Sequence, residues 1–138
     1  MTAAPPCVLA IDLGTSGPKA AVVSLQGELL ATARRPVAML HLPDGGVEQD
    51  PEEIWAATKA ACAAALGASP VPASRVVAVI CTSQYSSIVP VDAEERPTAN
   101  MVMWLDKRGA TPRLRGLPGF PRLADSPPRL LNWLHLHG

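Results

Sequence analysis

Hydrophobic and polar positions alternate in short blocks over the first part of the chain. Apolar residues fill 8–11 and 20–23, and each run is followed by residues that favour turns, at 12–17 and 26–27. Residues 28–37 have the composition of a further strand. This pattern predicts three antiparallel strands in sequence order, with a glycine-rich turn between the first two.

The segment after residue 49 has the pattern of a helix. Asp50 is placed to cap it, Pro51 suits the first helical position, and Glu53 completes the spacing of a capping box. Trp55 is expected to pack in the core, and Gly67 is expected to end the helix. The predicted core-facing stripe recurs every four residues and consists of Ile54, Thr58, Cys62 and Leu66.

The second half of the chain predicts more strands and then an irregular segment. The β-branched run 75–81 reads as a buried central strand. Further strands are expected at 88–91 and 101–104, with a polar turn at 92–97 between them. Residues 112–128 are dense in Pro, Gly and Arg, which predicts an irregular loop, followed by an amphipathic helix.

Composition narrows the class of protein. The 138 residues suit one modest domain, and 48% of them are hydrophobic, which is enough for a core. The net charge is zero and no basic run exceeds Arg34-Arg35, so we expect no nucleic-acid or membrane partner. Cys7, Cys62 and Cys81 form no CxxC pair, and we expect Cys62 and Cys81 to be buried thiols. Without a signal peptide or an apolar segment of spanning length, the expected location is the cytoplasm.

The stretch 11–19 carries the most chemistry. A tight hairpin with Gly14, Thr15 and Ser16 at its turn can direct backbone N–H groups and hydroxyls at a phosphate chain. Asp12 could hold Mg²⁺ through water, and Lys19 could supply a compensating positive charge. The same residue types also suit a plain β-hairpin, so spacing alone leaves both interpretations open.

Four segments in order resemble a known family. The pattern D-x-G-T-S-x-x-K at 12–19 resembles the first phosphate motif of actin-like ATPases. Residues 46–55, Ser83-Gln84, and the pair 92–97 and 104–108 then resemble segments of the FGGY carbohydrate kinases. Each match is weak alone, but together they span most of the chain in the order expected for that family.

The resemblance implies an α/β fold: an actin-like ATPase (ribonuclease H-like) domain, incomplete here, with an N-terminal antiparallel strand meander and flanking helices. Such kinases have two actin-like domains around a cleft and transfer the γ-phosphate of ATP to a sugar or polyol hydroxyl, with Mg²⁺. Asp12, Gly14, Thr15 and Ser16 would then lie at the ATP phosphates, with Asp12 at the metal and Lys19 supporting the turn. The residues expected to bind the sugar are Gln84, Tyr85, Ser86, Trp104 and Asp106.

Several of these positions have structural alternatives. Trp104 is expected to stack on the substrate, although it could also be a core residue. Arg108 could bond Asp106 or Asp92 rather than substrate. Glu48 and Gln49, directly before the helix, are interpreted as organising its start.

Two departures from the family pattern bear on the substrate and on one turn. Glu95 stands where family members tend to carry Gly. The Tyr85-Ser86 pair is neither the Arg-Glu of glycerol kinases nor the Met-His of xylulokinases. Uncharged hydrogen-bonding side chains at this place suit a neutral polyol or a ketose.

The same resemblance limits what the chain can do alone. Residues 1–138 correspond to part of the first domain, with a loose N-terminus at 1–6 and no second domain. The catalytic Asp and the adenine pocket of FGGY kinases follow the matched region, so we expect no catalytic residue here and no turnover. Alternatives are a degenerate sugar- or phosphate-binding half-domain, a partner-dependent subunit, or another actin-like ATPase. The implied partners are ATP and a small sugar or polyol, and the full-length enzyme could be a homodimer.

Overall fold

The computed structural model describes residues 4–110. The contacts within the chain divide it into two units, Met1–Arg108 and Gly109–Gly138, and the first of these carries the fold described below. The predictions for residues 112–128 and for the helix after them lie outside the described residues.

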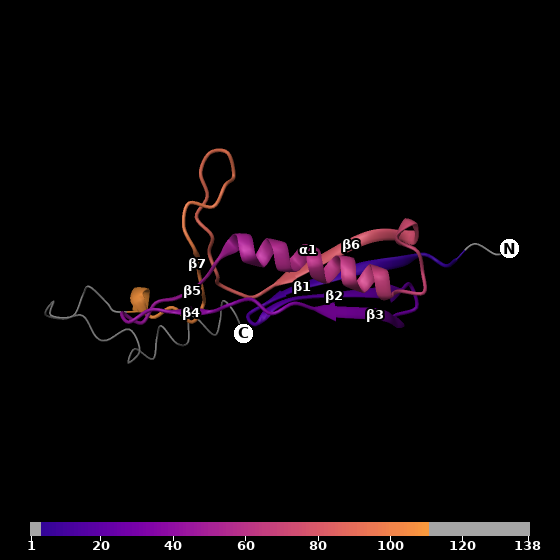
Figure 1. The fold of residues 1–138 in the computed structure, drawn as a ribbon, viewed down its shortest axis with the longest axis horizontal. Helices are drawn as coiled ribbons and strands as arrows, with labels where there is room; N and C mark the ends of the chain where they lie inside the picture. The colour runs from indigo at the N-terminus through magenta and orange to yellow at the C-terminus, as the bar shows by residue number, and fades with distance from the viewer. Residues whose placement is uncertain (1–3, 111–138) are drawn as a thin grey trace, which may run out of the picture. The chain divides into compact units, whose positions relative to one another are not determined.

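A four-stranded sheet forms the larger part of this unit (Figure 1). Its order is β3-β2-β1-β6, with β1 antiparallel to β2, β2 antiparallel to β3, and β6 parallel to β1. The predicted meander is therefore confirmed; its first two strands are longer than the apolar runs alone suggested, and its third is shorter than the predicted segment 28–37. The strands are β1 (Cys7–Gly14), β2 (Gly17–Ser24), β3 (Leu29–Arg34) and β6 (Val76–Ser83).

Helix α1 (Pro51–Ala68) begins as the sequence predicts. Asp50 caps it, because its Oδ1 accepts a hydrogen bond of 2.8 Å from the backbone N–H of Glu52. The capping box does not form: Glu53 Oε1 accepts from the backbone N–H of Ala38, 3.2 Å away. The helix also runs one residue past Gly67 before it ends.

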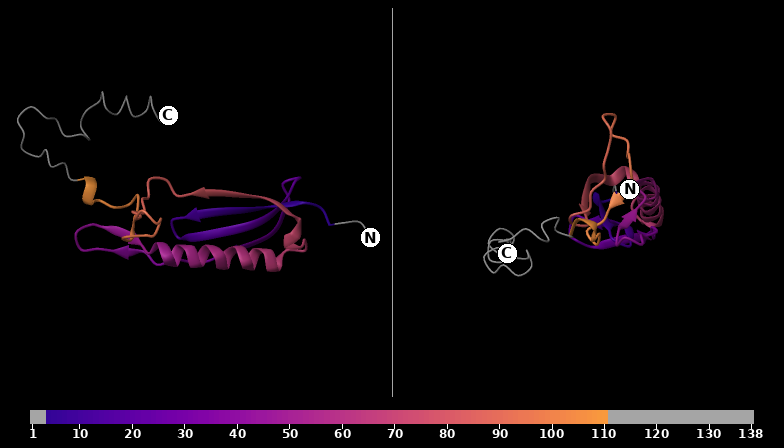
Figure 2. Two further views of the ribbon diagram at one scale, coloured as in Figure 1. Left: turned by 90° about the horizontal axis from the view of Figure 1, so that it is seen from above. Right: turned by 90° about the vertical axis from the view of Figure 1, so that its left-hand side faces the viewer.

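The core between α1 and the sheet is built from small and β-branched residues. The helix lies along strands β1–β3 (Figures 1 and 2) and buries Thr58, Ala61 and Ala65 against them. Alanines at this contact let the helix approach the sheet closely, which dense packing requires. The buried apolar cluster comprises Cys7, Leu9, Ala20, Val22, Ala61, Ala65 and Val71.

Trp55 does not join this core, so that prediction is wrong. Its side chain is 58% exposed, and the Lys59 ammonium lies 5.3 Å from the centre of its ring. The residues that α1 buries lie further round the helix, at Thr58, Ala61 and Ala65, which leaves Trp55 at the edge of the packed stripe.

Strand β6 differs most from its prediction. It pairs with β1 at one edge of the sheet, and from Val77 to Ser83 its residues are exposed within the part of the chain that the structure describes. Val77 and Val79 are 63% and 61% exposed, and the thiol of Cys81 is exposed rather than buried. The physical reason is that α1 packs on β1, β2 and β3, so the helix gives β6 little cover.

A smaller sheet lies beyond the N-terminal end of α1 (Figure 1). It consists of β4 (Leu40–His41), β5 (Val47–Gln49) and β7 (Met101–Val102), in the order β4-β5-β7 and all antiparallel. Its buried cluster is Val47, Met101 and Met103.

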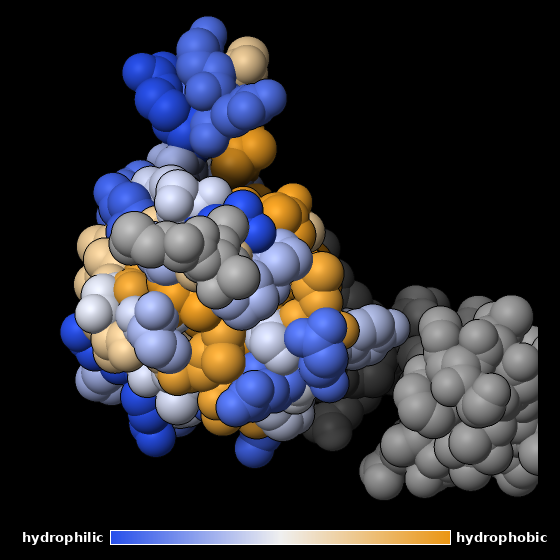
Figure 3. All heavy atoms as spheres, turned by 90° about the vertical axis from the view of Figure 1, so that its right-hand side faces the viewer, coloured by the Kyte–Doolittle hydropathy of each residue, from blue (hydrophilic) through white to orange (hydrophobic). Residues whose placement is uncertain are grey.

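The chain from Ile88 to Val102 forms a hairpin, in which only the second of the two predicted strands is present, shortened to β7. Ile88 pairs with Val102 and Val91 with Pro97, each as an isolated bridge. This hairpin projects from the unit, and its tip is hydrophilic (Figure 3). The remaining elements are two short 3-10 helices, η1 (Ala73–Arg75) and η2 (Arg108–Ala110). No helix among residues 4–110 is long and apolar enough to cross a membrane.

Candidate functional site

The turn between β1 and β2 presents free backbone donors. Gly14 and Gly17 are the last paired residues of the two strands, and Thr15 and Ser16 form the tip. Within the described part of the chain, no protein group accepts from the N–H of Thr15 or of Ser16. Two adjacent free N–H groups at a tight turn are what an anion such as a phosphate requires.

Gly14 and Gly17, on either side of this turn, differ in how much room their surroundings leave for a side chain. Gly17 has φ +117°, and a Cβ there would overlap the carbonyl oxygen of Arg35 and lie 2.9 Å from the Val37 nitrogen. Position 17 therefore requires glycine because a side chain there would clash with the neighbouring backbone. A Cβ at Gly14 would meet only Asp12 Oδ2 at 3.4 Å and the Gly17 carbonyl at 3.7 Å as its nearest neighbours. Gly14 is thus tolerant of a methyl group in this structure, and it faces the same side of the sheet as the Asp12 carboxylate.

Asp12 and Lys19 are directly opposite each other on β1 and β2. Lys19 Nζ lies 3.3 Å from Asp12 Oδ2, and about half of each side chain is exposed. An exposed pair of this kind contributes little to stability. It leaves a carboxylate and an ammonium accessible beside the free N–H groups of the turn.

Thr15, Gln49, Gln84 and Trp104 meet in one hydrogen-bonded network. Gln49 Nε2 donates to the Thr15 carbonyl oxygen at 3.0 Å, and Gln84 Nε2 donates to Gln49 Oε1 at 3.3 Å. The Thr15 hydroxyl donates to Gln84 Oε1 at 3.3 Å and accepts from the Trp104 indole N–H at 3.2 Å. The predicted phosphate turn and two of the predicted sugar-binding residues are therefore in direct contact.

The loop after β6 carries the other predicted sugar-binding residues. Gln84 extends the β1–β6 pairing, because its N–H donates to the Leu13 carbonyl at 3.0 Å. Tyr85 and Ser86 follow it and are exposed, and Ser86 has φ +57°. The Trp104 side chain is 53% exposed, so it is not the core residue that one alternative considered.

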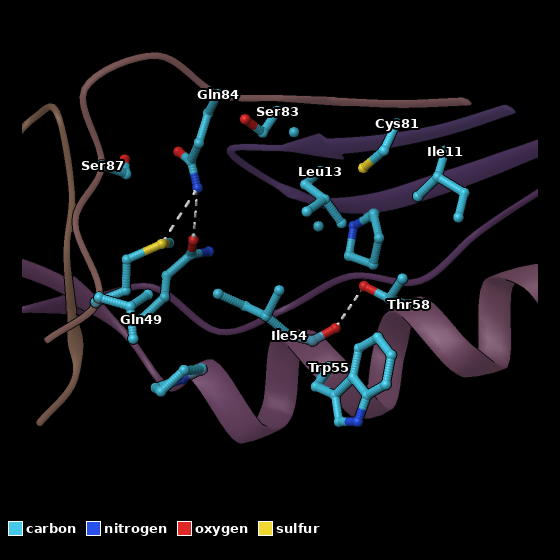
Figure 4. Close-up of a pocket in the computed structure, with 16 residues that line it drawn as sticks. Ile11, Leu13, Gln49, Ile54, Trp55, Thr58, Cys81, Ser83, Gln84 and Ser87 are labelled. Atoms are coloured by element: carbon cyan, nitrogen blue, oxygen red, sulfur yellow. Dashed lines mark hydrogen bonds between the residues drawn. The ribbon is translucent and has the colours of Figure 1, made fainter. Parts of the chain in front are cut away.

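An apolar cavity of about 360 Å³ adjoins this network. Figure 4 shows Gln49 and Gln84 at one end of it, with Leu13 and Ile11 of β1 on one side and Ile54 of α1 on another. Its lining also includes Trp55, Thr58, Cys81, Ser83, Ser87, Val89 and Met101.

Asp106 lies in an ion-pair cluster rather than at the turn. Arg108 bonds both Asp106 and Glu48, each at 2.6 Å. Asp106 Oδ2 also accepts from the backbone N–H of Val47 at 3.0 Å, and Asn100 donates to Glu48 at 3.0 Å. The Arg108 guanidinium holds the pKa of Asp106 well below its usual range, and the bonds from Asn100 and Arg108 lower the pKa of Glu48. Asp106 in turn, with Glu48, raises the pKa of Arg108. The cluster joins β5 to the segment after β7.

This geometry decides one alternative left open by the sequence. Arg108 bonds Asp106, as one alternative held, whereas Asp92 bonds Arg96 at 3.0 Å. Asp92 also accepts from the Arg96 backbone N–H at 2.8 Å, so this pair closes the tip of the hairpin. Glu95, in the place where glycine was expected, has φ +62°. Substrate binding by Asp106 stays a prediction that its protein contacts do not favour.

Gln49 is the site residue that sequence reasoning missed. It was interpreted as organising the helix start, but its side chain is 1% exposed and bonds the turn and the loop. Its signal is present in the sequence: in β5 the buried positions alternate, and Gln49 occupies an inward position, two residues from Val47. A buried amide needs partners, which marks it as part of a polar network.

No group of three or more metal-ligating side chains occurs among residues 4–110. Mg²⁺ needs no such group, because it commonly takes one or two carboxylates together with substrate phosphates, and Asp12 could supply one of them.

Comparison with known proteins assigns the family. Residues 7–113 match the model of the N-terminal domain of the FGGY family of carbohydrate kinases. The chain belongs to this family. A glycerol kinase of Rhodospirillum centenum is 38% identical over 106 residues, which are 76% of this chain and 21% of the relative. A glycerol kinase of Alcanivorax borkumensis is 36% identical over 107 residues, or 77% of this chain and 22% of the relative.

Solved structures agree on the fold of this FGGY domain. A xyloylose kinase from Brucella ovis superposes with a TM-score of 0.70 at 28% identity, covering 74% of this chain and 22% of the other. A gluconate kinase from Lactobacillus acidophilus gives 0.68 at 18% identity, covering 75% and 20%, which supports the fold alone. The predicted partial actin-like α/β domain is thus confirmed. The chain spans about one fifth of the length of the relatives it matches.

Proposed function

We propose that this FGGY chain provides the phosphate turn and one wall of the sugar site of an ATP-dependent kinase acting on a small sugar or polyol. The observation that carries the proposal is the contact between the two halves of the site. Thr15, at a turn with free N–H donors, is bonded directly to Gln84 and Trp104, which are two of the residues expected to hold the sugar. Transfer of a phosphoryl group requires both substrates at one place.

The nucleotide side would use the β1–β2 turn. The N–H groups of Thr15 and Ser16 and the Ser16 hydroxyl would bond phosphate oxygens, and Lys19 would offset their charge. Asp12 would hold Mg²⁺ through water or directly, with the remaining ligands supplied by phosphate oxygens. Bound Mg²⁺ would neutralise charge on the phosphates during transfer.

The sugar side would use the loop after β6 and Trp104. A half-exposed indole beside amide and hydroxyl groups suits a ligand with C–H patches and many hydroxyls. Tyr85 and Ser86 are exposed and offer hydroxyl groups for hydrogen bonding, which favours a neutral polyol or a ketose. The glycerol kinases and the xyloylose kinase to which this chain is similar have names within this class. Asp106, with its carboxylate held by Arg108 and Val47, would position this side rather than touch the sugar.

The 138-residue chain by itself would bind without turnover. Of the carboxylates discussed above, Asp12 pairs with Lys19 while Glu48 and Asp106 pair with Arg108. None of the three is a free base beside Gln84 and Trp104. General-base catalysis needs such a group within hydrogen-bond reach of the substrate hydroxyl. A second half of the site, from another part of a longer protein or from a partner chain, would supply it.

The test is binding of Mg²⁺ with inorganic triphosphate to the chain, followed by NMR of the Thr15 and Ser16 amides. We expect both amides to shift in the unmodified chain. Gly14→Ala should weaken binding about tenfold, because its methyl group would lie beside the Asp12 carboxylate and hinder the close approach of phosphate, while leaving the free energy of unfolding nearly unchanged. Gly67→Ala is the matched control, since nothing lies within 4 Å of a Cβ there, its φ is not positive and it is outside the site, near the C-terminal end of α1.

Three results would count against the proposal. One is the absence of any shift at Thr15 and Ser16, and another is equal binding by the Gly14→Ala chain. Phosphorylation of glycerol or xylulose by the chain alone, with ATP and Mg²⁺, would overturn the claim that it lacks a catalytic base.

A further inference from the structure

We propose that Gln49 is a positioning residue that fixes the phosphate turn relative to the sugar-side loop, so that occupation of one is transmitted to the other. The inference rests on the proposed function for the roles of the turn and the loop, but the contacts stand independently of it. Gln49 is the buried member of the network, and it touches Thr15 on one side and Gln84 on the other.

The direction of each hydrogen bond in the network follows from its two ends. The Thr15 carbonyl can only accept, so Gln49 must present its Nε2 to it and its Oε1 to Gln84. Gln84 then donates from Nε2 and has Oε1 free to accept from the Thr15 hydroxyl. The Trp104 indole can only donate, so the Thr15 hydroxyl must accept from it. One orientation of both amides satisfies all four bonds.

Gln49 is anchored on more than one side. It is the last residue of β5, where its backbone pairs with that of Met101 in β7, and Asp50, the cap of α1, follows it directly. Its side chain therefore connects the smaller sheet and the helix start to the β1–β2 turn. A rigidly held amide is a fixed reference point for two segments that are otherwise exposed.

The closed network also assigns Thr15 a particular role. Its hydroxyl has one proton, which is given to Gln84, so this hydroxyl cannot donate to a phosphate while the network is closed. The turn would then meet phosphate through the two backbone N–H groups and the Ser16 hydroxyl. If a phosphate does draw the Thr15 proton, Gln84 Oε1 loses its donor and becomes free to accept from a sugar hydroxyl. Thr15 is thus the member of the network that can switch, and Gln49 is the member that stays.

The experiment uses the ¹⁵N-labelled 138-residue chain without ligand, comparing it with Gln49→Met and with Gln26→Met. Methionine keeps the length of the side chain and removes both amide contacts, and Gln26 is an exposed glutamine in the turn between β2 and β3, at the other end of β2 from Thr15. In Gln49→Met we expect hydrogen exchange at the Trp104 indole and the Gln84 side-chain amide to quicken about threefold to tenfold, as loss of a net hydrogen bond predicts. Amides in the interior of β1 and β2 should keep their rates, as should every group in Gln26→Met.

Unchanged exchange at Trp104 and Gln84 would overturn the proposal, and so would a uniform increase across β1 and β2, which would mean a purely structural role. If Gln49→Met does not fold, Gln84→Met breaks the same network from its exposed side. It should likewise quicken exchange at the Trp104 indole, and an unchanged rate there would overturn the proposal.

Titration with Mg²⁺ and triphosphate separates this inference from the proposed function. In the unmodified chain we expect the Gln84 amide and the Trp104 indole to shift together with Thr15 and Ser16. In Gln49→Met we expect Thr15 and Ser16 to shift but the other two to respond by less than about half, and an equal response would show that transmission from Thr15 does not need the placement that Gln49 provides. If Thr15 and Ser16 do not shift in either chain, the proposed binding of phosphate by the turn is wrong. The hydrogen-exchange experiment without ligand still tests whether Gln49 is a positioning residue.

Discussion

The two sheets of this FGGY domain are stabilised in different ways. The four-stranded sheet buries a continuous apolar cluster against α1, in which Val22 and Ala65 have no exposed surface. The β4-β5-β7 sheet has strands of two or three residues and a buried cluster of Val47, Met101 and Met103. Its segments are joined in addition by ion pairs and amide hydrogen bonds between residues far apart in the chain.

This difference separates the scaffold from the site. The free energy gained by hydrophobic burial is proportional to the apolar area removed from water and has no preferred direction. It therefore suits the part of the fold that serves as a scaffold. Hydrogen bonds and ion pairs depend on distance and direction, so they suit the placement of groups that must meet a substrate. The network of Thr15, Gln49, Gln84 and Trp104 lies where the larger sheet meets the smaller one, and it uses residues from both.

The largest expected effect tests the packing of the four-stranded sheet. Gly17→Ala should lower the free energy of unfolding by about 3 kcal/mol or more, because it combines a left-handed backbone with overlap against the Arg35 carbonyl. Gly27→Ala is the control, since Gly27 has φ +86° and nothing within 4 Å, and it should cost about 1 kcal/mol. Urea unfolding followed by circular dichroism measures both. Equal losses in the two variants would show that close packing at Gly17 does not matter.

An intermediate effect tests the ion pairs of the smaller sheet. Because the pKa of Asp106 and that of Glu48 are lowered in the folded chain, their contribution is fully present above about pH 4 and is lost as the pH falls toward the folded values. Asp106→Asn should therefore have a lower Tm than the unmodified chain at neutral pH. It should also lose less Tm between about pH 5 and pH 2, since the group that titrates has been removed.

The control for the acid experiment is Glu94→Gln, whose carboxylate is 67% exposed and belongs to the hairpin tip. Thermal melts followed across the same pH range should give parallel curves for this variant and the unmodified chain. If the curve for Asp106→Asn is also parallel, the ion-pair cluster does not support the smaller sheet.

The smallest expected effect concerns the hairpin that precedes β7. Glu95 has φ +62°, which costs a non-glycine residue roughly 1–2 kcal/mol, and glycine loses roughly 0.5–1 kcal/mol of backbone entropy in exchange. Glu95→Gly should thus stabilise the fold by about 0.5 kcal/mol. Glu94→Gly, at a position outside the left-handed region, should destabilise it by about the same amount. A loss of stability in both variants, measured by urea unfolding, would show that the turn carries no strain.

Much of the larger sheet could be predicted because its elements are specified locally. The apolar run and turn at 8–17 and the cap at Asp50 lie within a few residues of what they determine. The prediction for β6 was wrong in its burial, although the strand exists. The β-branched run at 76–80 reports a preference for the extended conformation, whereas burial depends on what packs against the strand.

The geometry of the candidate site was predicted in part. The turn after β1 was expected, since glycine and hydroxyl residues after a strand carry a local signal, and the structure places Gln84 against it. The roles of both at phosphate and sugar stay predictions. Gln49 was missed as a member of the network, and substrate binding by Asp106 stays a prediction, although the Asp106 carboxylate bonds Arg108 and the Val47 N–H. Those roles depend on partners 2 to 59 residues away in the sequence, and spacing along the chain does not say which partner a polar group will choose.

The sequence by itself determined the strand order of the meander, the start of α1 and the family, because each follows from residues that are neighbours in the chain or stand in a fixed order. Only the tertiary structure decided that Trp55 is exposed, that Arg108 bonds Asp106, and that Thr15 contacts both Gln84 and Trp104. The physical reason is that propensity and turn chemistry act over a few residues, while burial and polar pairing depend on the distances that folding creates between remote ones.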